Sequence, residues 1–293
     1  MPRLTANQYA DTTSGLLHWK DYGGSGPTIV LVHGLGGSLI NWDAVGPRIA
    51  ALGRTVAVDL PGFGLSPPAG DWKPETYATA VRDFVEVIGG PVTLVGNSMG
   101  GLVSEIVAAN YPDMVSNLVL VSPATPPRFP DPRLDLPTVA RLAAQATPGL
   151  GIAISRSYRH RYDPRELVKL SLDRIAYKPS RIPPTVVEDL VALSETRYQF
   201  PWAVDAVPRG ARAIASMWAK PAEFVAMIRK ITAPTLVVHG VEDPIVSPTA
   251  VEWLVGLRLD WDLIQMEDTG HTPQLDAPVR FVETITPWLK RHL

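Results

Sequence analysis

Short runs of consecutive apolar residues recur along the chain, each bounded by polar or turn-forming residues. The runs richest in valine, isoleucine and leucine are residues 28–32, 55–58, 92–95, 118–121 and 235–238. A strand inside a parallel sheet is covered on both faces, so it is apolar at every position rather than at alternate ones. These runs therefore predict the central strands of a parallel sheet.

Between the runs, apolar residues return every three or four positions, which is the period of a helix with one buried face. The clearest stretches of this kind are residues 77–88, 102–107 and 224–231. Strands alternating with helices indicate βαβ units and hence an α/β fold. At the ends of this pattern we expect an exposed antiparallel edge strand over residues 16–22, a last strand over 261–266 and a last helix over 278–289.

The alternation stops between about residues 125 and 221, where no strand is evident. This segment opens with a proline-rich connection and continues with helical patterns. Within it, residues 163–166 read Asp-Pro-Arg-Glu, which is typical of an N-terminal capping box with proline at the first helical position. We interpret the segment as a helical cap, so the predicted division is a core of residues 1–124 and 222–293 with an insertion of residues 125–221.

Composition and charge exclude several classes of protein. The 27 basic and 29 acidic side chains leave a net charge of −2, which disfavours an electrostatic grip on nucleic acid or an anionic membrane. No apolar run approaches the roughly 20 residues of a membrane-spanning helix. Without cysteine there are no disulfides, thiolate metal sites or cysteine nucleophile. The first 15 residues are polar, so we expect no signal peptide and a cytoplasmic protein.

A candidate nucleophile follows the third apolar run. Residues Gly96-Asn97-Ser98-Met99-Gly100 have the spacing G-x-S-x-G between a predicted strand and a predicted helix. In such an elbow the serine lies on a tight bend at the carboxyl end of the sheet, and only small residues fit two positions before and after it. The N-terminus of the helix then directs its dipole at the reacting centre. The alternative is a plain glycine-rich turn.

A second glycine-rich loop, residues 33–37, follows the first apolar run. A hydrolase needs hydrogen-bond donors for the charge that develops on a carbonyl oxygen. We expect the backbone N–H groups of Leu35 and Met99 to form this oxyanion hole, and Gly34 and Gly36 to lie against the substrate. The alternative, a phosphate-binding loop, is poorly supported because the chain has neither G-x-G-x-x-G running into a helix nor a Walker lysine.

The acid and the base are expected at the ends of the last two strands. Asp243 follows the fifth apolar run, with Glu242 as its competitor, and residues 122–123 after the fourth run offer no carboxylate. His271 lies in the loop between the last strand and the last helix. The chain order Ser98, Asp243, His271 is the order of nucleophile, acid and base expected in this architecture. A solvated aspartate and an ordinary surface or core histidine are the alternatives.

Taken together, these residues resemble the α/β-hydrolase superfamily in its serine hydrolase branch. The likeness covers nearly the whole chain and rests on residues 33–34, 59–66, 96–100, 243 and 270–271. It implies an eight-stranded, mostly parallel sheet, a helical cap inserted after the sixth strand, and no cofactor. Esterases, monoacylglycerol-lipase-like enzymes and carbon–carbon bond hydrolases are the most similar groups. The last of these usually have tryptophan after the catalytic histidine, where this chain has Thr272.

The resulting hypothesis is a hydrolase for carboxylic esters with a small or medium acyl group, acting through an acyl-enzyme. Cap residues such as Trp202 and Trp218 are candidates for an acyl pocket, with packing inside the cap as the alternative. A carbon–carbon bond hydrolase, a thioesterase, a hydroxynitrile lyase or a cofactor-free perhydrolase would use nearly the same groups. A ligand-binding protein on the same fold is the alternative outside enzymes. No spacing of metal ligands is visible, and the sequence carries no indication of an oligomeric state.

Overall fold

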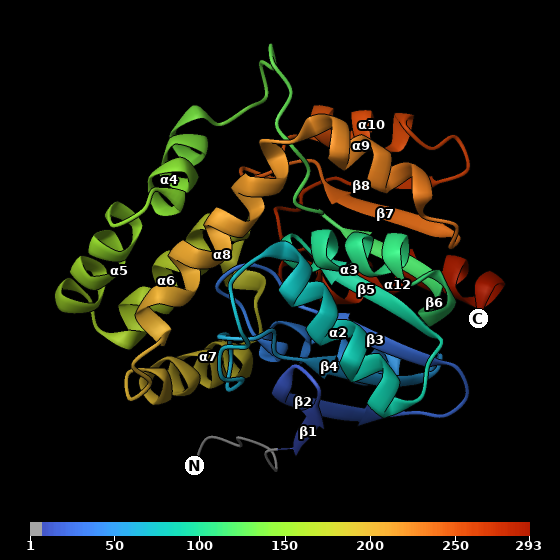
Figure 1. Ribbon diagram of the computed structural model, residues 1–293, viewed down its shortest axis with the longest axis horizontal. Helices are drawn as coiled ribbons and strands as arrows, with labels where there is room; N and C mark the ends of the chain where they lie inside the picture. Colours follow the sequence, from blue (N-terminus) through green and yellow to red (C-terminus); the bar gives the residue numbers. More distant parts are fainter. Residues whose placement is uncertain (1–7) are drawn as a thin grey trace.

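The computed structural model describes residues 8–293 and contains one eight-stranded sheet (Figure 1). In chain order the strands are β1 (Gln8–Thr12), β2 (Gly15–Gly23), β3 (Thr28–Val32), β4 (Arg54–Val58), β5 (Val92–Asn97), β6 (Val115–Val121), β7 (Thr235–Gly240) and β8 (Asp262–Met266). Their order in the sheet is β1-β2-β4-β3-β5-β6-β7-β8. Strand β2 pairs antiparallel with both β1 and β4, and every later pair is parallel. The predicted eight-stranded, mostly parallel sheet is confirmed.

The five apolar runs form β3 to β7, and each begins or ends within a few residues of its predicted bounds. The expectation for residues 16–22 was partly wrong. Strand β2 is antiparallel as predicted, but β1 lies outside it and is the true edge strand. Strand β1 was missed because only Ala10 of its five residues is buried, so it has no apolar run to reveal it. The expectation of no signal peptide falls partly on residues 1–7, outside the described part of the chain.

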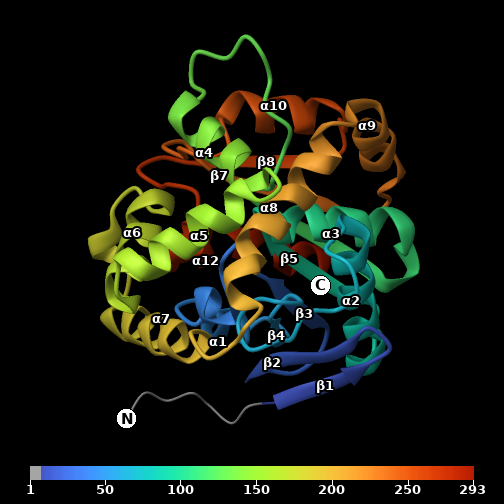
Figure 2. The same cartoon turned by 60° about the vertical axis from the view of Figure 1, so that its left-hand side comes forward.

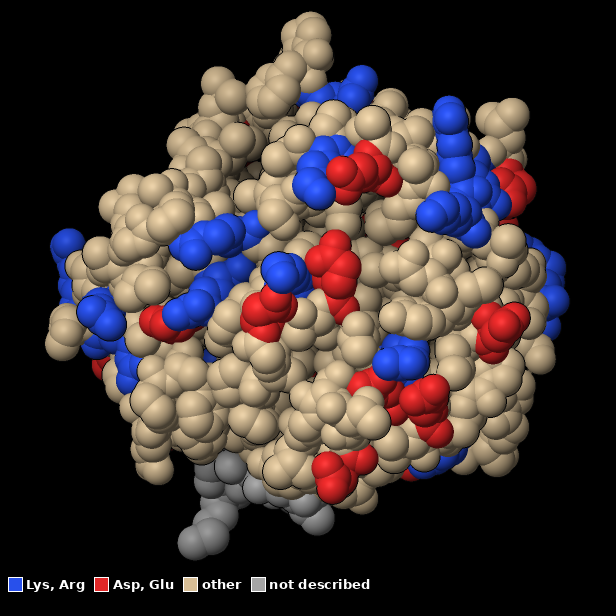
Figure 3. Space-filling model, viewed as in Figure 1, with Lys and Arg blue, Asp and Glu red and all other residues tan. Residues whose placement is uncertain are grey.

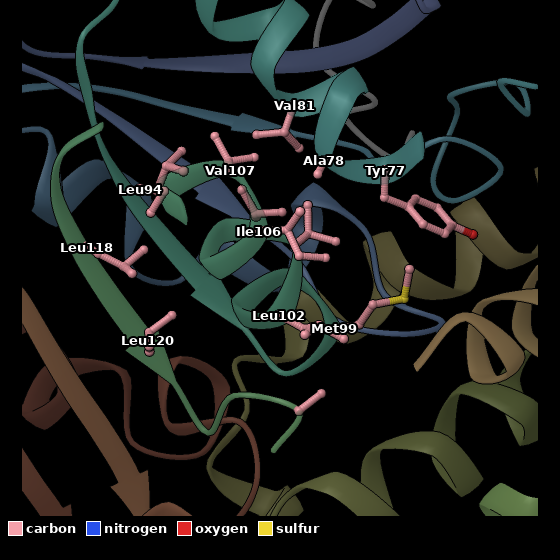
Figure 4. Packing of buried hydrophobic residues seen from close by; sticks show 14 of the residues in the cluster. Tyr77, Ala78, Val81, Leu94, Met99, Leu102, Ile106, Val107, Leu118 and Leu120 are labelled. Atoms are coloured by element: carbon pink, nitrogen blue, oxygen red, sulfur yellow. The ribbon is translucent and has the colours of Figure 1, made fainter. Parts of the chain in front are cut away.

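Helices cover both faces of the sheet. One face is packed by α2 (Pro74–Ile88), α3 (Met99–Asn110), α9 (Pro221–Lys230) and α10 (Pro248–Gly256). The other is packed by α1 (Gly46–Ile49) and α12 (Pro278–His292). Figure 4 shows Leu102 and Ile106 of α3 and Leu94 and Leu118 of the sheet, which belong to one buried cluster in the first of these layers. Three short helices, η1 (Leu39–Trp42), η2 (Pro112–Met114) and α11 (Pro273–Asp276), complete this part of the structure.

Between β6 and α9 the chain is helical, as the sequence predicts. It forms α4 (Leu136–Ala146), α5 (Leu150–Arg161), α6 (Pro164–Ile175), η3 (Pro179–Arg181), α7 (Pro184–Arg197) and α8 (Ala203–Trp218). The five α-helices among them lie together on one side of the sheet (Figures 1 and 2). The predicted capping box is confirmed: the Glu166 N–H donates to the Asp163 carboxylate at 2.8 Å, and the Asp163 N–H donates to the Glu166 carboxylate at 2.9 Å. The division at residues 124 and 221 stays a prediction.

Asp59 organises the glycine-rich turn that follows β4. Its carboxylate accepts the backbone N–H groups of Leu39 at 2.7 Å and Leu65 at 2.9 Å. The same carboxylate lies 2.7 Å from Nδ1 of the buried His18. The Ser66 hydroxyl donates to the Asp59 carbonyl at 2.8 Å, which closes the turn.

Arg197 of α7 fastens the helical segment to this turn. Its guanidinium donates to the carbonyl of Gly64 at 2.5 Å and to that of Gly62 at 2.9 Å. Burial lowers the pKa of Arg197 to about 10, so the guanidinium is still charged at neutral pH. Hydrogen bonds from a charged donor are stronger than neutral ones, and this contact therefore ties α7 to the core of the protein.

The distribution of charge and the character of the helices can both be described from the structure. Acidic and basic side chains are interspersed on the face shown in Figure 3, so that face presents no extended area of a single charge. Within residues 8–293, no helix combines the length and the apolar character needed to cross a bilayer.

Candidate active site

Ser98 lies on a sharp bend between β5 and α3. Its backbone has φ 53° and ψ −117°, a conformation that residues other than glycine rarely adopt and that typically costs about 1–3 kcal/mol. A Cβ atom on Gly96 would lie 2.4 Å from the Gly100 carbonyl oxygen, and one on Gly100 would lie 2.3 Å from that of Val32. These distances agree with the prediction that only small residues fit two positions before and after the serine.

Backbone hydrogen bonds hold this bend from the neighbouring strand. The Ser98 N–H donates to the Val121 carbonyl at 2.9 Å, and the Ala124 N–H donates to the Ser98 carbonyl at 3.0 Å. The next residue, Met99, is the first of α3, so its N–H has no carbonyl one turn earlier in the helix to accept it. The predicted nucleophile and a backbone donor that the helix itself does not use therefore lie side by side at the N-terminus of α3.

Asp243 and His271, 28 residues apart in the chain, are brought together by the ends of β7 and β8. His271 Nδ1 lies 2.7 Å from Asp243 Oδ2, and both side chains are buried. The other carboxylate oxygen, Oδ1, accepts the backbone N–H groups of Ile245 at 2.7 Å and Val246 at 3.0 Å. These bonds fix the orientation of the carboxylate, which in turn fixes that of the imidazole.

The structure distinguishes Asp243 from Glu242, the other candidate for the acid that orients the histidine. The Glu242 carboxylate turns away to accept the Thr269 N–H at 2.8 Å. Burial alone would raise the pKa of Asp243, but the attraction and hydrogen bond of His271 outweigh it, and the pKa of this carboxyl lies below its ordinary value. Asp243 is therefore ionised at neutral pH and able to stabilise a positive charge on His271.

The main chain of His271 is tied to the residue that precedes the serine. The Asn97 side-chain amide donates to the His271 carbonyl at 3.1 Å and to that of Val121 at 3.0 Å. On the other side, the His271 N–H donates to the Ile175 carbonyl at 2.8 Å. The histidine loop is thus held between the Ser98 bend and the end of α6.

Asp276 joins the same loop to the helical segment. Its buried carboxylate accepts the backbone N–H groups of Gly270 at 2.7 Å, Tyr177 at 2.9 Å and Lys178 at 3.0 Å. A Cβ atom on Gly270 would lie 2.6 Å from the Tyr177 nitrogen, so this close approach requires glycine. The position of His271 consequently depends on the segment after α6 as well as on the sheet.

His33 fixes the peptide that carries the second predicted oxyanion donor. The Leu60 N–H donates to His33 Nε2 at 3.0 Å, so the ring proton lies on Nδ1, which donates to the Gly34 carbonyl at 2.8 Å. That carbonyl shares a planar trans peptide with the Leu35 N–H, which must therefore point the opposite way. Burial lowers the pKa of His33 and keeps this arrangement neutral.

Helix α8 passes over the two predicted oxyanion residues. A Cβ atom on Gly210 would lie 2.6 Å from the Leu35 side chain and 3.4 Å from the Met99 sulfur, and one on Gly36 would lie 3.4 Å from Val207. A Cβ atom on Gly34 would in turn lie 3.0 Å from that of Ser98. The loop of residues 34–36 is thereby packed between the serine and α8.

The two tryptophans that the sequence singles out have different surroundings. The Trp218 indole N–H donates to the Ala124 carbonyl at 2.9 Å. Its ring lines an apolar recess together with Leu142 of α4 and residues 245–246, which lie next to Asp243. Trp202, just before α8, stacks on Phe200 with ring centres 4.9 Å apart. A role of either side chain in substrate binding stays a prediction.

Several of these contacts were not predicted from the sequence. His33 and Asn97 lie inside the two motifs, so their positions were a usable signal, but their bonding partners were not predictable. The only sequence signal for Gly210 was that it is a glycine inside a helical pattern. No pattern among its neighbours in the sequence singled out Asp276. In the described part of the chain, no group of three or more histidine and acidic side chains is arranged to hold a metal ion.

Comparison with known proteins finds relatives that are named as hydrolases. The chain is 29% identical over 290 residues to the 2-hydroxy-6-oxo-6-(2'-aminophenyl)hexa-2,4-dienoic acid hydrolase of Metapseudomonas resinovorans, covering 92% of this chain and 86% of that protein. It is 29% identical over 262 residues to the pimeloyl-[acyl-carrier protein] methyl ester esterase of Neisseria meningitidis, covering 86% of this chain and 90% of that protein.

Among solved structures, the wild-type Cfl2 protein of Burkholderia cenocepacia superposes with a TM-score of 0.82 at 22% identity, covering 99% of this chain and 98% of that one. At that identity the likeness concerns the fold alone. A family model described as the alpha/beta hydrolase family matches residues 29–284. Because this match takes in most of its length, the chain belongs to the alpha/beta hydrolase family.

Proposed function

We propose that the protein is a serine hydrolase that cleaves carboxylic esters with a small or medium acyl group. The observation that carries this proposal is the 2.7 Å contact between His271 Nδ1 and Asp243 Oδ2, in a loop tied through Asn97 to the bend at Ser98. A serine on a strained bend, together with a histidine that is oriented by a buried carboxylate and whose loop is tied to that bend, supports the activation of an alcohol as a nucleophile. The esterase from Neisseria meningitidis supports the choice of an ester.

The proposed reaction has two halves. His271 Nε2 takes the proton of the Ser98 hydroxyl as Oγ bonds to the ester carbonyl carbon, and the carbonyl oxygen becomes an anion held by the N–H groups of Met99 and Leu35. The anion collapses, the C–O bond breaks, and His271 returns the proton to the departing alcohol. Water then attacks the acyl-enzyme with His271 again as base, which releases the carboxylic acid and restores Ser98. Asp243 stabilises the imidazolium in both halves.

Residues 125–221 form the proposed cap in this scheme. In this proposal the acyl group of the substrate lies between the cap and the bend at Ser98. The loop of residues 34–36 would contact the substrate from the other side.

A fluorophosphonate probe tests the nucleophile directly. Wild type is expected to be labelled and to hydrolyse p-nitrophenyl esters, and Ser98→Ala is expected to lose both. Ser104→Ala, in the helix that follows Ser98, is a matched control, since this hydroxyl donates to the Gly100 carbonyl at 2.7 Å and has no part in the proposed reaction. A folded wild type that stays unlabelled, or a Ser98→Ala protein with wild-type turnover, would refute the proposal.

A carbon–carbon bond hydrolase is the second candidate, favoured by the Metapseudomonas resinovorans relative at 29% identity over 92% of this chain. A series of p-nitrophenyl esters of increasing acyl length, run beside a vinylogous diketone, separates the two. Saturable hydrolysis of the shorter esters supports the esterase, and activity confined to the diketone supports the second candidate.

A further inference from the structure

Asp276 of α11 is a fully buried acidic residue whose side chain contacts two distant parts of the chain at once. Its Oδ2 accepts the backbone N–H groups of Gly270 at 2.7 Å and Tyr177 at 2.9 Å, and its Oδ1 accepts that of Lys178 at 3.0 Å. Gly270 immediately precedes His271, whereas residues 177–178 lie between α6 and α7. One carboxylate therefore joins the histidine loop to a segment 98 to 99 residues earlier in the chain.

The main chain of His271 is bonded to the same segment. Its N–H donates to the Ile175 carbonyl at 2.8 Å, so the successive N–H groups of residues 270 and 271 are both held from this side. The approach is close, since a Cβ atom on Gly270 would lie 2.9 Å from the Ile175 carbonyl oxygen. From the opposite side, the Asn97 amide donates to the His271 carbonyl at 3.1 Å. The position of His271 is therefore set by residues 175–178 and Asp276 together with the bend at Ser98.

A second set of contacts joins the same two segments at the surface. The carboxylate of Asp268 pairs with Lys178 at 2.5 Å and also with Arg181. All three of these side chains are between 34% and 45% exposed, and ion pairs in contact with water contribute little because the solvent screens them. A buried carboxylate that accepts backbone N–H groups forms stronger bonds, since they are charge-assisted and less screened. Asp276 is therefore the stronger of the two connections.

We propose that Asp276 is a positioning residue for His271 and that it couples the placement of this base to the segment between α6 and α7. Without the carboxylate, the buried Gly270 N–H has no acceptor, and the histidine loop and residues 177–178 separate to regain bonding partners. The catalytic consequence rests on the proposed function: a shift of about 1 Å in a reacting group typically costs about 10²-fold in rate. The coupling itself does not depend on any substrate.

The first test is amide hydrogen exchange of the whole chain, resolved by residue, which needs no activity. Asp276→Leu removes every acceptor at similar size, and Asp276→Asn keeps an oxygen that takes the place of Oδ2. In the leucine variant the amides of residues 270–271 and 177–178 should exchange faster together, by about tenfold or more. In the asparagine variant Gly270 and Tyr177 should stay near their wild-type rates, because Oδ2 is the atom that accepts both.

Asp83→Leu is the matched control for the loss of a buried carboxylate. Asp83 lies in α2, is buried, and accepts the hydroxyl groups of Thr13 and Ser14. Its replacement should lower the stability of the fold without a selective increase in exchange at residues 270–271 and 177–178. Wild-type exchange at these residues in Asp276→Leu, or faster exchange in only one of the two segments, would overturn the inference.

The second test is steady-state hydrolysis of p-nitrophenyl esters. Asp276→Leu should lower kcat by about 10²-fold with KM unchanged, and Asp276→Asn should recover kcat to within about tenfold of wild type. Asp83→Leu should keep the wild-type kcat, because its carboxylate has no contact with the histidine loop. A general loss of stability would not produce the recovery in the asparagine variant. Equal losses of kcat in the leucine and asparagine variants, or none in either, would contradict the positioning role.

Gly270→Ala replaces Asp276→Leu if the latter does not fold. Its Cβ atom would lie 2.6 Å from the Tyr177 nitrogen and so push the two segments apart while Asp276 stays in place. It should speed exchange at residues 177–178 and lower kcat, and wild-type values of both would refute the coupling. A wild type that neither hydrolyses esters nor reacts with fluorophosphonate refutes the proposed function, and the exchange measurement still decides the role of Asp276.

Discussion

Glu105 has a buried carboxyl group. Its ionisation should destabilise the folded protein, and this effect should be measurable in the pH dependence of stability. Glu105 lies in α3, six residues beyond Met99, the first residue of the helix, with an exposed fraction of 1%. Neither carboxylate oxygen has a hydrogen-bond partner within the described residues. Burial raises the pKa of Glu105 from 4.5 to about 8, and no charge contributes to that shift.

The direction in which the free energy of unfolding changes with pH follows from proton binding. Between pH 4.5 and 8 the folded protein holds a proton on Glu105 that the unfolded chain has released, so the free energy of unfolding falls as the pH rises. The slope from this one group is about 1.4 kcal/mol per pH unit. The stability is fully present below pH 4.5 and is lost progressively up to pH 8; at pH 7 the loss amounts to about 3 kcal/mol.

Glu105→Gln keeps the shape of the side chain and removes the titration. Chemical denaturation from pH 5 to pH 8 should therefore show a wild-type stability that declines relative to the variant, by about 3 kcal/mol over two to three pH units. Glu283→Gln, at an exposed glutamate of α12, is the matched control and should run parallel to wild type. Parallel curves for wild type and Glu105→Gln would refute the reasoning.

Two further predictions concern the site and its attachment. Asp243→Asn should lower kcat for ester hydrolysis by about 10⁴-fold, because an amide cannot stabilise the imidazolium; steady-state kinetics that show less than a tenfold loss would contradict the assigned role. Arg197→Ala should lower the free energy of unfolding by about 3 kcal/mol, because the bonds from its guanidinium to Gly62 and Gly64 are lost. It should also speed proteolysis within residues 125–221, and an unchanged cleavage rate would argue against this attachment.

The sequence by itself determined the parts of this protein that depend on local physics. Continuous apolar runs gave the strands β3 to β7, because a strand covered on both faces must be apolar throughout. The bend at Ser98 was also predictable, since its glycines stand where a Cβ atom would meet backbone oxygens at 2.3–2.4 Å. The capping box at residues 163–166 likewise depends only on neighbours along the chain.

Only the tertiary structure decided which side chains meet. Adjacent carboxylates at residues 242 and 243 are equivalent in sequence, and the pairing of β7 with β8 directs one to His271 and the other to Thr269. The hydrogen bond between Leu60 and His33 likewise joins residues that are distant in the chain. Local patterns report burial and turns, but the register between strands fixes which polar atoms come within bonding distance, and that register is a property of the whole sheet.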